Sequence, residues 1–444
     1  MKKAGIFKAL SMTLILTGIL SMTACGKNHT MTNSKSDTTG VSESPDTAEP
    51  TEITFWNVVD DPNNAMSKRF EAVVKEVEKD LNVKINYEIT SGEVYHTKLK
   101  VAMAGDELPD IFHMYAGPGE WEPLLNSEAA APLNDVLESS GIGSKYMDGY
   151  LIKNSDQNIY SVPFRVNLIQ VMYYNKDIFK DLGINPPTTW DEFKNACSLA
   201  SSKGYNAIGL GEKDRWMGDL IYNTLVLRED PQAFQKALKG EMKYSDKPFL
   251  DAAIKVNELV NMGAFQKGYM TSLEADVVEN FISGKTAMYS NGSWAFSDLI
   301  DKMGDKLGYM PFPATGADTQ PELSACGNAN NNPYGLAVSA KSKNLEKAKL
   351  VAVTISKLYN DYAVKEGEQP YMVTDVNPDK PVNPEFAKYI EDCAKLKFVQ
   401  TYWGDFLPAD ITEPYRDLNQ ALFTGKMDPQ KYVNEQQQIL SLME

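Results

Sequence analysis

After residue 50 the chain alternates between two hydrophobic periods, and this alternation constrains the fold more than any other feature of the sequence. Apolar residues recur at every second position in 51–57 and 83–89, as they do in half-buried strands. Between these segments, 64–81 carries apolar residues at helical spacing, and a second helix over 95–104 leads into a third strand at 108–112. Successive units of this kind predict a parallel sheet covered by helices on both faces.

Two aromatic residues and one amide follow these strands at the positions where such sheets bind ligands. Ligands bind beyond the carboxyl ends of the strands, and Trp56, Asn57 and Tyr115 stand there, with His113 nearby. His96 falls on a predicted helix, where we expect it to face solvent. The sequence therefore predicts a ligand site at this edge of the sheet.

The length of the chain predicts a second lobe. At 444 residues it exceeds the size at which one hydrophobic core usually stops growing. Two further strands are expected at 159–164 and 168–174. Thr189 and Glu192 have the spacing of a capping box, so a helix begins there and buries Trp190. The last helix is expected to begin at Asp428, followed by Pro429 in its first turn.

The N-terminus has the pattern of an exported protein. An apolar run from Leu10 to Leu20 follows lysines and is too short for a membrane helix, which indicates a signal peptide over 1–24. Small residues precede Cys25, as in the lipobox that the sequence resembles, in which the cysteine is acylated and becomes the new N-terminus. The alternative is an ordinary cysteine near a cleavage site. Residues 25–50 are polar and predict a flexible tether.

Charge and cysteine content exclude two further classes. The net charge is −16, and removal of 1–24 takes away three lysines and makes it −19, so a nucleic-acid partner is not expected. After Cys25 only Cys197, Cys326 and Cys393 remain. We expect no disulfide framework and at most one bridge, and the sequence does not say which pair would form it.

The segment FISGKTAMYSNGSWAF, 281–296, contains Gly-Lys-Thr, which resembles the end of a phosphate-binding loop. That loop also requires a glycine five residues before Gly284, and this chain has Glu279 there, whose carboxylate would repel a phosphate. We interpret the glycine and Lys285 as a turn that joins a helix to a strand over 286–289.

No common catalytic or metal motif is present in the sequence. The chain has three histidines, and it lacks His-Glu-x-x-His, Gly-x-Ser-x-Gly and Cys-x-x-Cys. The sequence therefore predicts no cofactor, no metal and no enzyme. Paired carboxylates for glycoside hydrolysis stay open, because 60 acidic residues always supply some pair.

Aromatic and amide residues at predicted strand ends favour a sugar ligand. Flat rings cover the C–H faces of a sugar, while amide and carboxylate groups bond its hydroxyls. The candidates on this ground are Trp56, Asn57, Tyr115, Trp216, Trp294, Asn332, Tyr334, Trp403 and Asp405.

Several segments, in this order and spacing, resemble the extracellular solute-binding proteins of bacterial ABC importers, in the carbohydrate-binding family that includes maltose-binding protein. They are ITFWN at 53–57, AGDELPDIF at 104–112, IYSVPF at 159–164, YYNKDIFKDLGINPPTTWDEF at 173–193, FISGKTAMYSNGSW at 281–294 and YGLAVSAKSKNLEKA at 334–348. The resemblance covers the chain from residue 51 to its end.

The resemblance implies an α/β, two-lobe, periplasmic-binding-protein-like fold of type II, with a ligand cleft between lobes joined by a hinge of two or three crossings. Lobe 1 is expected over 51–166 plus 311–373, and lobe 2 over 167–310 plus 374–444. Family contacts carried onto this chain are Asn57, Asp60 in the 59–61 turn, Tyr115, Arg165 or Asn167, Asp214 or Trp216, Trp294 and Trp403. The segment after the third strand, 113–117, departs from maltose-binding protein, so no maltodextrin preference is implied.

The implied function is capture of a sugar or oligosaccharide by hinge closure and delivery to an ABC permease, by a monomer anchored through acylated Cys25. The outer face of a Gram-positive cytoplasmic membrane is favoured over a Gram-negative periplasm. Three alternatives stay open: a non-sugar ligand such as an acidic sugar, phosphodiester or peptide, a surface glycosidase, and a structural lipoprotein. Arg165 would favour an anion if it faced the cleft, and a hinge salt bridge is the other interpretation.

Overall fold

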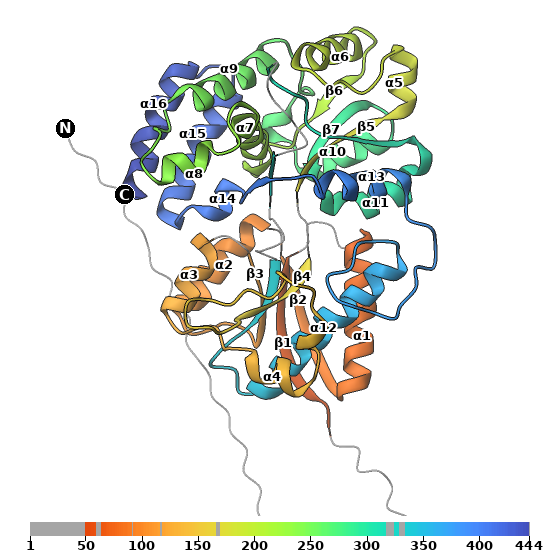
Figure 1. Cartoon of the computed structure of the whole chain (residues 1–444), viewed down its shortest axis with the longest axis vertical. Coiled ribbons are helices and arrows are strands. Elements are labelled where there is room, and N and C mark those ends of the chain that lie inside the picture. The colour runs from red at the N-terminus through yellow and green to blue at the C-terminus, as the bar shows by residue number, and fades with distance from the viewer. Residues whose placement is uncertain are drawn as a thin grey trace, which may run out of the picture. The chain divides into compact units, whose positions relative to one another are not determined.

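In the computed structural model, the described helices and strands belong to the unit Glu49–Glu444. The structure describes residues 49–58, 64–90, 92–115, 118–165, 169–316, 324–327 and 334–443. The predicted signal peptide and nearly all of the tether lie outside these residues. The described chain is built on two sheets, which define lobe 1 and lobe 2 (Figure 1).

The sheet of lobe 1 has five strands in the order β2-β1-β3-β10-β4. Its strands are β1 (Thr51–Val58), β2 (Val83–Thr90), β3 (Ile111–Met114), β4 (Ser161–Arg165) and β10 (Tyr334–Val338). Strand β1 is parallel to β2 and β3, as the sequence predicted, whereas β10 is antiparallel to both β3 and β4. The parallel arrangement predicted for the first three strands is therefore confirmed, and β10, a strand from far along the chain, adds an antiparallel pairing that the sequence did not indicate.

Helices cover both faces of this sheet, as predicted. Helices α1 (Ala65–Leu81) and α12 (Leu345–Lys365) lie on one face, and α2 (Gly92–Ala104) and α3 (Pro118–Asn126) lie on the other (Figure 1). A short helix, α4 (Asn134–Ser139), contacts α12. The alternation in β1 explains the two cores, because Phe55 belongs to the cluster under α1 while Val58 belongs to the cluster under α2.

The sheet of lobe 2 has four strands in the order β6-β7-β5-β8. Its strands are β5 (Gln170–Asn175), β6 (Asn206–Gly209), β7 (Thr286–Gly292) and β8 (Leu307–Met310). Strand β5 is antiparallel to β7 and β8, and β6 is parallel to β7. A separate pair, β9 (Ser324–Cys326) and β11 (Phe398–Gln400), is parallel.

Most of the described helices belong to lobe 2. They are α5 (Lys176–Leu182), α6 (Trp190–Ser202), α7 (Trp216–Glu229), α8 (Ala233–Leu238), α9 (Lys247–Asn261), α10 (Glu274–Ile282), α11 (Phe296–Met303), α13 (Pro384–Cys393), α14 (Trp403–Phe406), α15 (Ala409–Phe423) and α16 (Pro429–Leu440).

Local signals in lobe 2 were predicted correctly. The capping box at Thr189 and Glu192 is formed, and the Asp428 side chain accepts from the backbone of Lys431 at the start of α16. Trp190 is buried, and its Nε1 donates to Glu258. Gly284 joins α10 to β7 with φ at +74°, a left-handed conformation that favours glycine, which confirms the turn.

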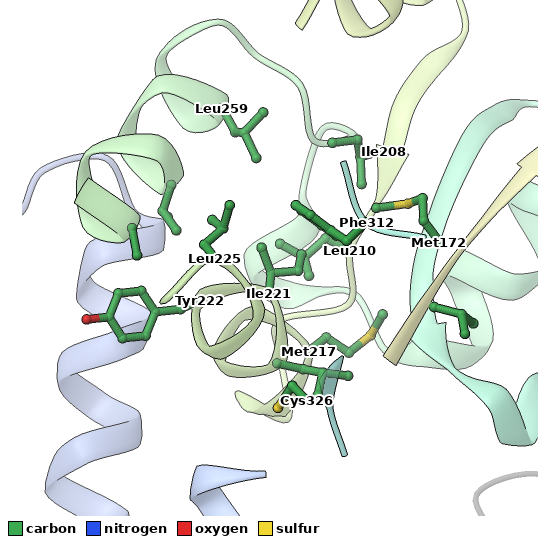
Figure 2. Close-up of a cluster of buried hydrophobic side chains, with 14 of the residues drawn as sticks. Met172, Ile208, Leu210, Met217, Ile221, Tyr222, Leu225, Leu259, Phe312 and Cys326 are labelled. Atoms are coloured by element: carbon green, nitrogen blue, oxygen red, sulfur yellow. The ribbon is translucent and has the colours of Figure 1, made fainter. Parts of the chain in front are cut away.

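Helix α7 forms the centre of the core of lobe 2. It is buried on nearly every side, as expected for an interior helix. Figure 2 shows Ile221, Leu225 and other α7 side chains packed with Phe312 and Cys326. Phe312, Ala325 and Cys326 also pack in this core.

The cysteines form no disulfide among the described residues. Cys197 and Cys326 are buried thiols in the core of lobe 2, and Cys393 on α13 is partly exposed. Burial raises the pKa of the Cys197 thiol to about 12, so it stays protonated at neutral pH. The expectation that the chain lacks a disulfide framework is confirmed for these three residues.

Candidate functional site

The strand ends of lobe 1 bring three predicted site residues together. Strands β1 and β3 are neighbours, with Trp56 opposite Phe112, so Trp56 and Asn57 lie beside the segment that ends in Tyr115. Asn57 is fully buried, and its Oδ1 accepts a 2.9 Å hydrogen bond from the backbone of Val58. Its Nδ2 is buried without a hydrogen-bond partner among the described residues. An amide donor is the kind of group that bonds sugar hydroxyls, and in this structure it is closed off from solvent.

The aromatic rings of this group are covered by side chains of α2. The ammonium of Lys98 lies 3.6 Å from the centre of the Trp56 ring and also pairs with Glu88. His96 is partly exposed, as the sequence suggested in part, and it also stacks on Tyr115 with ring centres 4.4 Å apart. Lys98 was missed by sequence analysis, because no local pattern says which ring a helix residue will cover.

A second aromatic group belongs to lobe 2. Trp216 is the first residue of α7, and Trp294 lies in the single turn Ser293–Ala295 between β7 and α11. Their ring centres are 5.7 Å apart with a 51° tilt, and both side chains are partly exposed. The two indoles form an apolar corner of the kind that can cover the face of a sugar ring.

Glycine and arginine residues hold this corner in place. A Cβ at Gly292 would lie 1.7 Å from the Trp294 ring, so only glycine lets the indole pack over the backbone. Arg215, with φ at +63°, precedes α7 and pairs with Glu413 and Asp417 at 2.8 and 2.7 Å. Asp214 is partly exposed and lies two residues before Trp216.

Two buried acids lie under the start of α7. Glu212 is fully buried and accepts a 2.8 Å hydrogen bond from the backbone of Gly218. Burial raises the pKa of Glu212 to about 8, and nearby Asp219 adds to the rise. Burial also raises the pKa of Asp219 to about 6, although Tyr415 donates a 2.6 Å hydrogen bond to it. Glu212 is therefore mostly protonated at neutral pH.

A pocket next to Trp294 is lined by residues of both lobes. It has about 640 Å³ of space not occupied by atoms, part of it open to solvent. Its lining from lobe 1 is Met66, Arg69, Phe164, Tyr359, Ala363, Glu368, Gln369 and Tyr371, and from lobe 2 it is Ser293, Trp294, Phe296, Ser297, Phe386, Tyr389 and Ile390. Sequence analysis found only Trp294 in this set. Apart from its close neighbours Ser293, Phe296 and Ser297, the lining residues lie on α1, β4, α12, the segment after α12 and α13, far from Trp294 in the sequence.

The structure does not support Trp403 as a ligand platform. Its side chain is fully buried in the core of lobe 2, where it stacks on Phe406 at 4.7 Å and packs against Phe234 at 4.6 Å. Neither ring face is open to a ligand. Its sequence pattern, an aromatic pair before a glycine, is the same for a core residue and for a platform.

The remaining predicted residues are described in part or not at all. Asp60, Asn167, Asn332 and the lipidation residue Cys25 lie outside the described residues. Arg165 and Tyr334 are opposite each other in the pairing of β4 with β10, and Asp405 belongs to α14. For these three the structure describes the backbone alone.

Two searches of the described residues found nothing. No group of three or more histidine, cysteine, aspartate or glutamate residues there could hold a metal ion. Among the same residues, no helix combines the length and the apolar character needed to cross a membrane.

The chain has two α/β lobes, with aromatic and amide groups at their strand ends and a pocket that both lobes line. These features define a two-domain binding protein with the type II periplasmic-binding-protein fold. Residues 63–406 match the family model described as bacterial extracellular solute-binding protein. This match covers most of the chain, and the protein belongs to that family.

Relatives and solved structures agree with this assignment. The multiple sugar-binding protein of Streptococcus mutans is 26% identical over 333 residues, which are 71% of this chain and 76% of the relative. The melibiose/raffinose/stachyose-binding protein MelE of Bacillus subtilis is 23% identical, over 85% of this chain and 90% of its own. A structure from work on xylan utilization by Caldanaerobius polysaccharolyticus is 28% identical with a TM-score of 0.78, and covers 87% of this chain and 99% of that one.

Proposed function

We propose that this protein captures a neutral sugar or oligosaccharide between its two lobes and delivers it to an ABC permease, without chemical change to the sugar. The observation that carries the proposal is the Trp216–Trp294 corner, with ring centres 5.7 Å apart on partly exposed side chains. The buried Nδ2 of Asn57 in lobe 1 would donate to a hydroxyl. The relatives named above, which include a multiple sugar-binding protein, support the same ligand class.

Capture would follow from contacts that form fully only when the lobes close on the ligand. A ligand that touches both lobes binds the closed form better and shifts the population toward it. A shift from 1:99 to 99:1 needs about 5.5 kcal/mol of differential binding. Contacts with two tryptophan faces in one lobe and several hydrogen bonds from both lobes would supply a binding free energy of this order.

The arginines favour a neutral ligand over an anion. Each arginine with a described side chain already faces carboxylates or carbonyl oxygens of the protein. The pairs are Arg69 with Glu366 and Glu368, Arg215 with Glu413 and Asp417, Arg228 with the carbonyls of Phe312 and Ser324, and Arg416 with Glu413. Among the arginines, an anionic ligand would have to rely on Arg165, which is the second candidate from the sequence.

A thermal-shift screen of Glu49–Glu444 tests the ligand class. We expect neutral mono- or oligosaccharides to raise the Tm by a few degrees, since a ligand at 100 times its Kd stabilises the fold by about 2.7 kcal/mol. Arg165→Ala should leave that shift in place. If only acidic sugars, phosphodiesters or peptides raise the Tm, and Arg165→Ala removes the effect, the neutral-sugar proposal is wrong.

Long incubation with the stabilising sugar separates a binding protein from a glycosidase. We expect chromatography to recover the sugar unchanged, because binding and closure require no bond cleavage. Release of shorter sugars would instead indicate hydrolysis by a carboxylate pair.

The proposed anchor is Cys25 with two acyl chains, which places the protein on the outer face of the cytoplasmic membrane. Each buried CH₂ adds about 0.8 kcal/mol to membrane affinity, so two chains give stable attachment. We expect Cys25→Ala to move the expressed protein from the membrane fraction to the soluble fraction. Cys393→Ala is the matched control, and should stay with the membrane. A Cys25→Ala protein that stays there as well would contradict the anchor.

A further inference from the structure

A cluster of two partly exposed glutamates around a buried arginine lies on the lobe 1 side of the pocket. Arg69 on α1 is 1% exposed, and its guanidinium bonds Glu368 at 2.9 Å through Nη1 and Glu366 at 3.2 Å through Nε. The same guanidinium lies 5.0 Å from the centre of the Tyr359 ring. Both carboxylates follow the end of α12. Because Arg69 Nη2 also donates to Glu368 Oε1, two hydrogen bonds from one arginine fix the position of the Glu368 side chain.

The Glu368 carboxylate also bonds lobe 2. The Oγ of Ser297 donates to Glu368 Oε1, and Ser297 lies in the first turn of α11, three residues after Trp294. Burial alone would raise the pKa of Glu368, but Arg69, the Ser297 hydrogen bond and, to the smallest extent, the charge of Lys380 hold that pKa below its usual value. Glu368 is thus an ionised acceptor that lobe 1 holds in place. Its donor, the hydroxyl of Ser297, belongs to lobe 2.

We propose that Ser297 and Glu368 form a latch that holds the lobes in the arrangement of this structure, before any ligand is bound. The proposal rests on the proposed function, in which closure of the lobes captures the ligand. Arg69 orders the carboxylate whatever the position of lobe 2, so the hydrogen bond from Ser297 is gained only when the lobes meet. A hydrogen bond to a charged group is among the stronger ones in proteins, and one made in a single arrangement shifts the population toward it.

The latch also connects the lobes at the ligand site. Trp294 and Ser297 belong to one continuous segment, the turn Ser293–Ala295 followed by α11. When Ser297 engages Glu368, the indole of Trp294 lies in the pocket wall beside Arg69 and Phe164 of lobe 1. The latch would therefore stabilise the closed arrangement, and a smaller part of the ligand's binding free energy would be needed to close the lobes.

A second side-chain contact of α11, with the segment that follows α12, provides an internal control. Lys380 lies 3.3 Å from Asp301 on α11, and its neighbour Asp379 is bonded to the backbone of Lys365 at the end of α12. Both side chains of this pair are more than half exposed, at 56% and 55%. Solvent-exposed ion pairs contribute little, so loss of this pair should leave the arrangement of the lobes unchanged.

Small-angle scattering of ligand-free Glu49–Glu444 tests the latch with four variants. We expect Ser297→Thr to keep the radius of gyration of the original protein, because threonine retains the hydroxyl donor. Ser297→Ala should raise the ratio of open to closed molecules by about tenfold, and Ser297→Asp should raise it further through repulsion of Glu368. Lys380→Ala should scatter like the original protein. The Tm of each variant confirms that it is folded.

The outcomes separate the latch from the ligand proposal, because no ligand is present. An unchanged radius of gyration in a folded Ser297→Asp protein would overturn the latch whatever the ligand turns out to be. The latch would be supported by a larger radius of gyration in Ser297→Ala and Ser297→Asp, together with an unchanged radius in Ser297→Thr and Lys380→Ala. If that order is seen and no sugar raises the Tm, the latch stands and the sugar proposal fails.

Discussion

Trp294→Ala is expected to abolish the rise in Tm that the sugar ligand causes. The indole forms the corner with Trp216 and lines the pocket that both lobes share. Truncation of a central aromatic contact typically costs about 2–4 kcal/mol of binding, which is a loss of roughly 30- to 1,000-fold in affinity. A ligand concentration that saturates the original protein would then leave the variant mostly unbound. The measurement is a thermal-shift titration with the sugar found in the screen.

Trp190→Ala and Gly292→Ala are the matched variants for this experiment. Trp190 is buried in the core of lobe 2, so its truncation should lower the Tm of the ligand-free protein and keep the ligand-induced shift. Gly292→Ala displaces the Trp294 ring without removing it, since the new Cβ would overlap the indole. It should weaken binding much as Trp294→Ala does. Binding that survives both Trp294→Ala and Gly292→Ala would exclude this corner as the sugar platform.

Glu212→Gln is expected to change how stability depends on pH. The pKa of Glu212 rises from 4.5 to about 8 in the folded protein, chiefly through burial. Between these values the folded state binds more protons than the unfolded state, so stability falls as the pH rises through this window. Glutamine carries no charge at any of these pH values. The variant should therefore be more stable than the original protein at pH 8, by on the order of a few kcal/mol, and similar to it near pH 5.

Urea unfolding at several pH values measures this effect. The interval from pH 6 to pH 8 isolates Glu212, because the raised pKa of Asp219 is about 6 and its contribution falls mostly below that interval. The other charged groups that act on Glu212 are Asp214 and Arg215. Glu279→Gln on the exposed side of α10 is the control and should keep the original slope. Equal slopes for Glu212→Gln and the original protein would show that Glu212 titrates normally.

Local patterns in the sequence predicted local structure well. The strand, helix and strand from Thr51 to Thr90, the capping box at Thr189 and the last helix at Asp428 all formed as expected, because their signals lie within a few residues of one another. The direction of β10 was not predictable in this way. Its place between β3 and β4 depends on pairing with strands about 170 to 220 residues earlier.

The sequence predicted the kinds of residue in the candidate site better than it predicted which individual residues lie there. Strand-end aromatic residues and the family resemblance located Trp216 and Trp294, which the structure brings together. The same reasoning chose Trp403, which is core, because the residues that bury it come from α8 and from the segment before α9. The covering of Trp56 by Lys98, and the cluster around Arg69, depend on tertiary packing that no sequence window contains.

The order in which the chain visits the two lobes has a consequence for folding. The core of lobe 1 needs β10 and α12, which follow almost all of the sheet of lobe 2 in the sequence. The core of lobe 2 needs side chains of α15 and α16, at the very end of the chain. Neither lobe can therefore complete its core while the C-terminal part is still missing. Long sequence separations between partners slow folding, so we expect a growing chain to stay largely unfolded until synthesis is nearly finished.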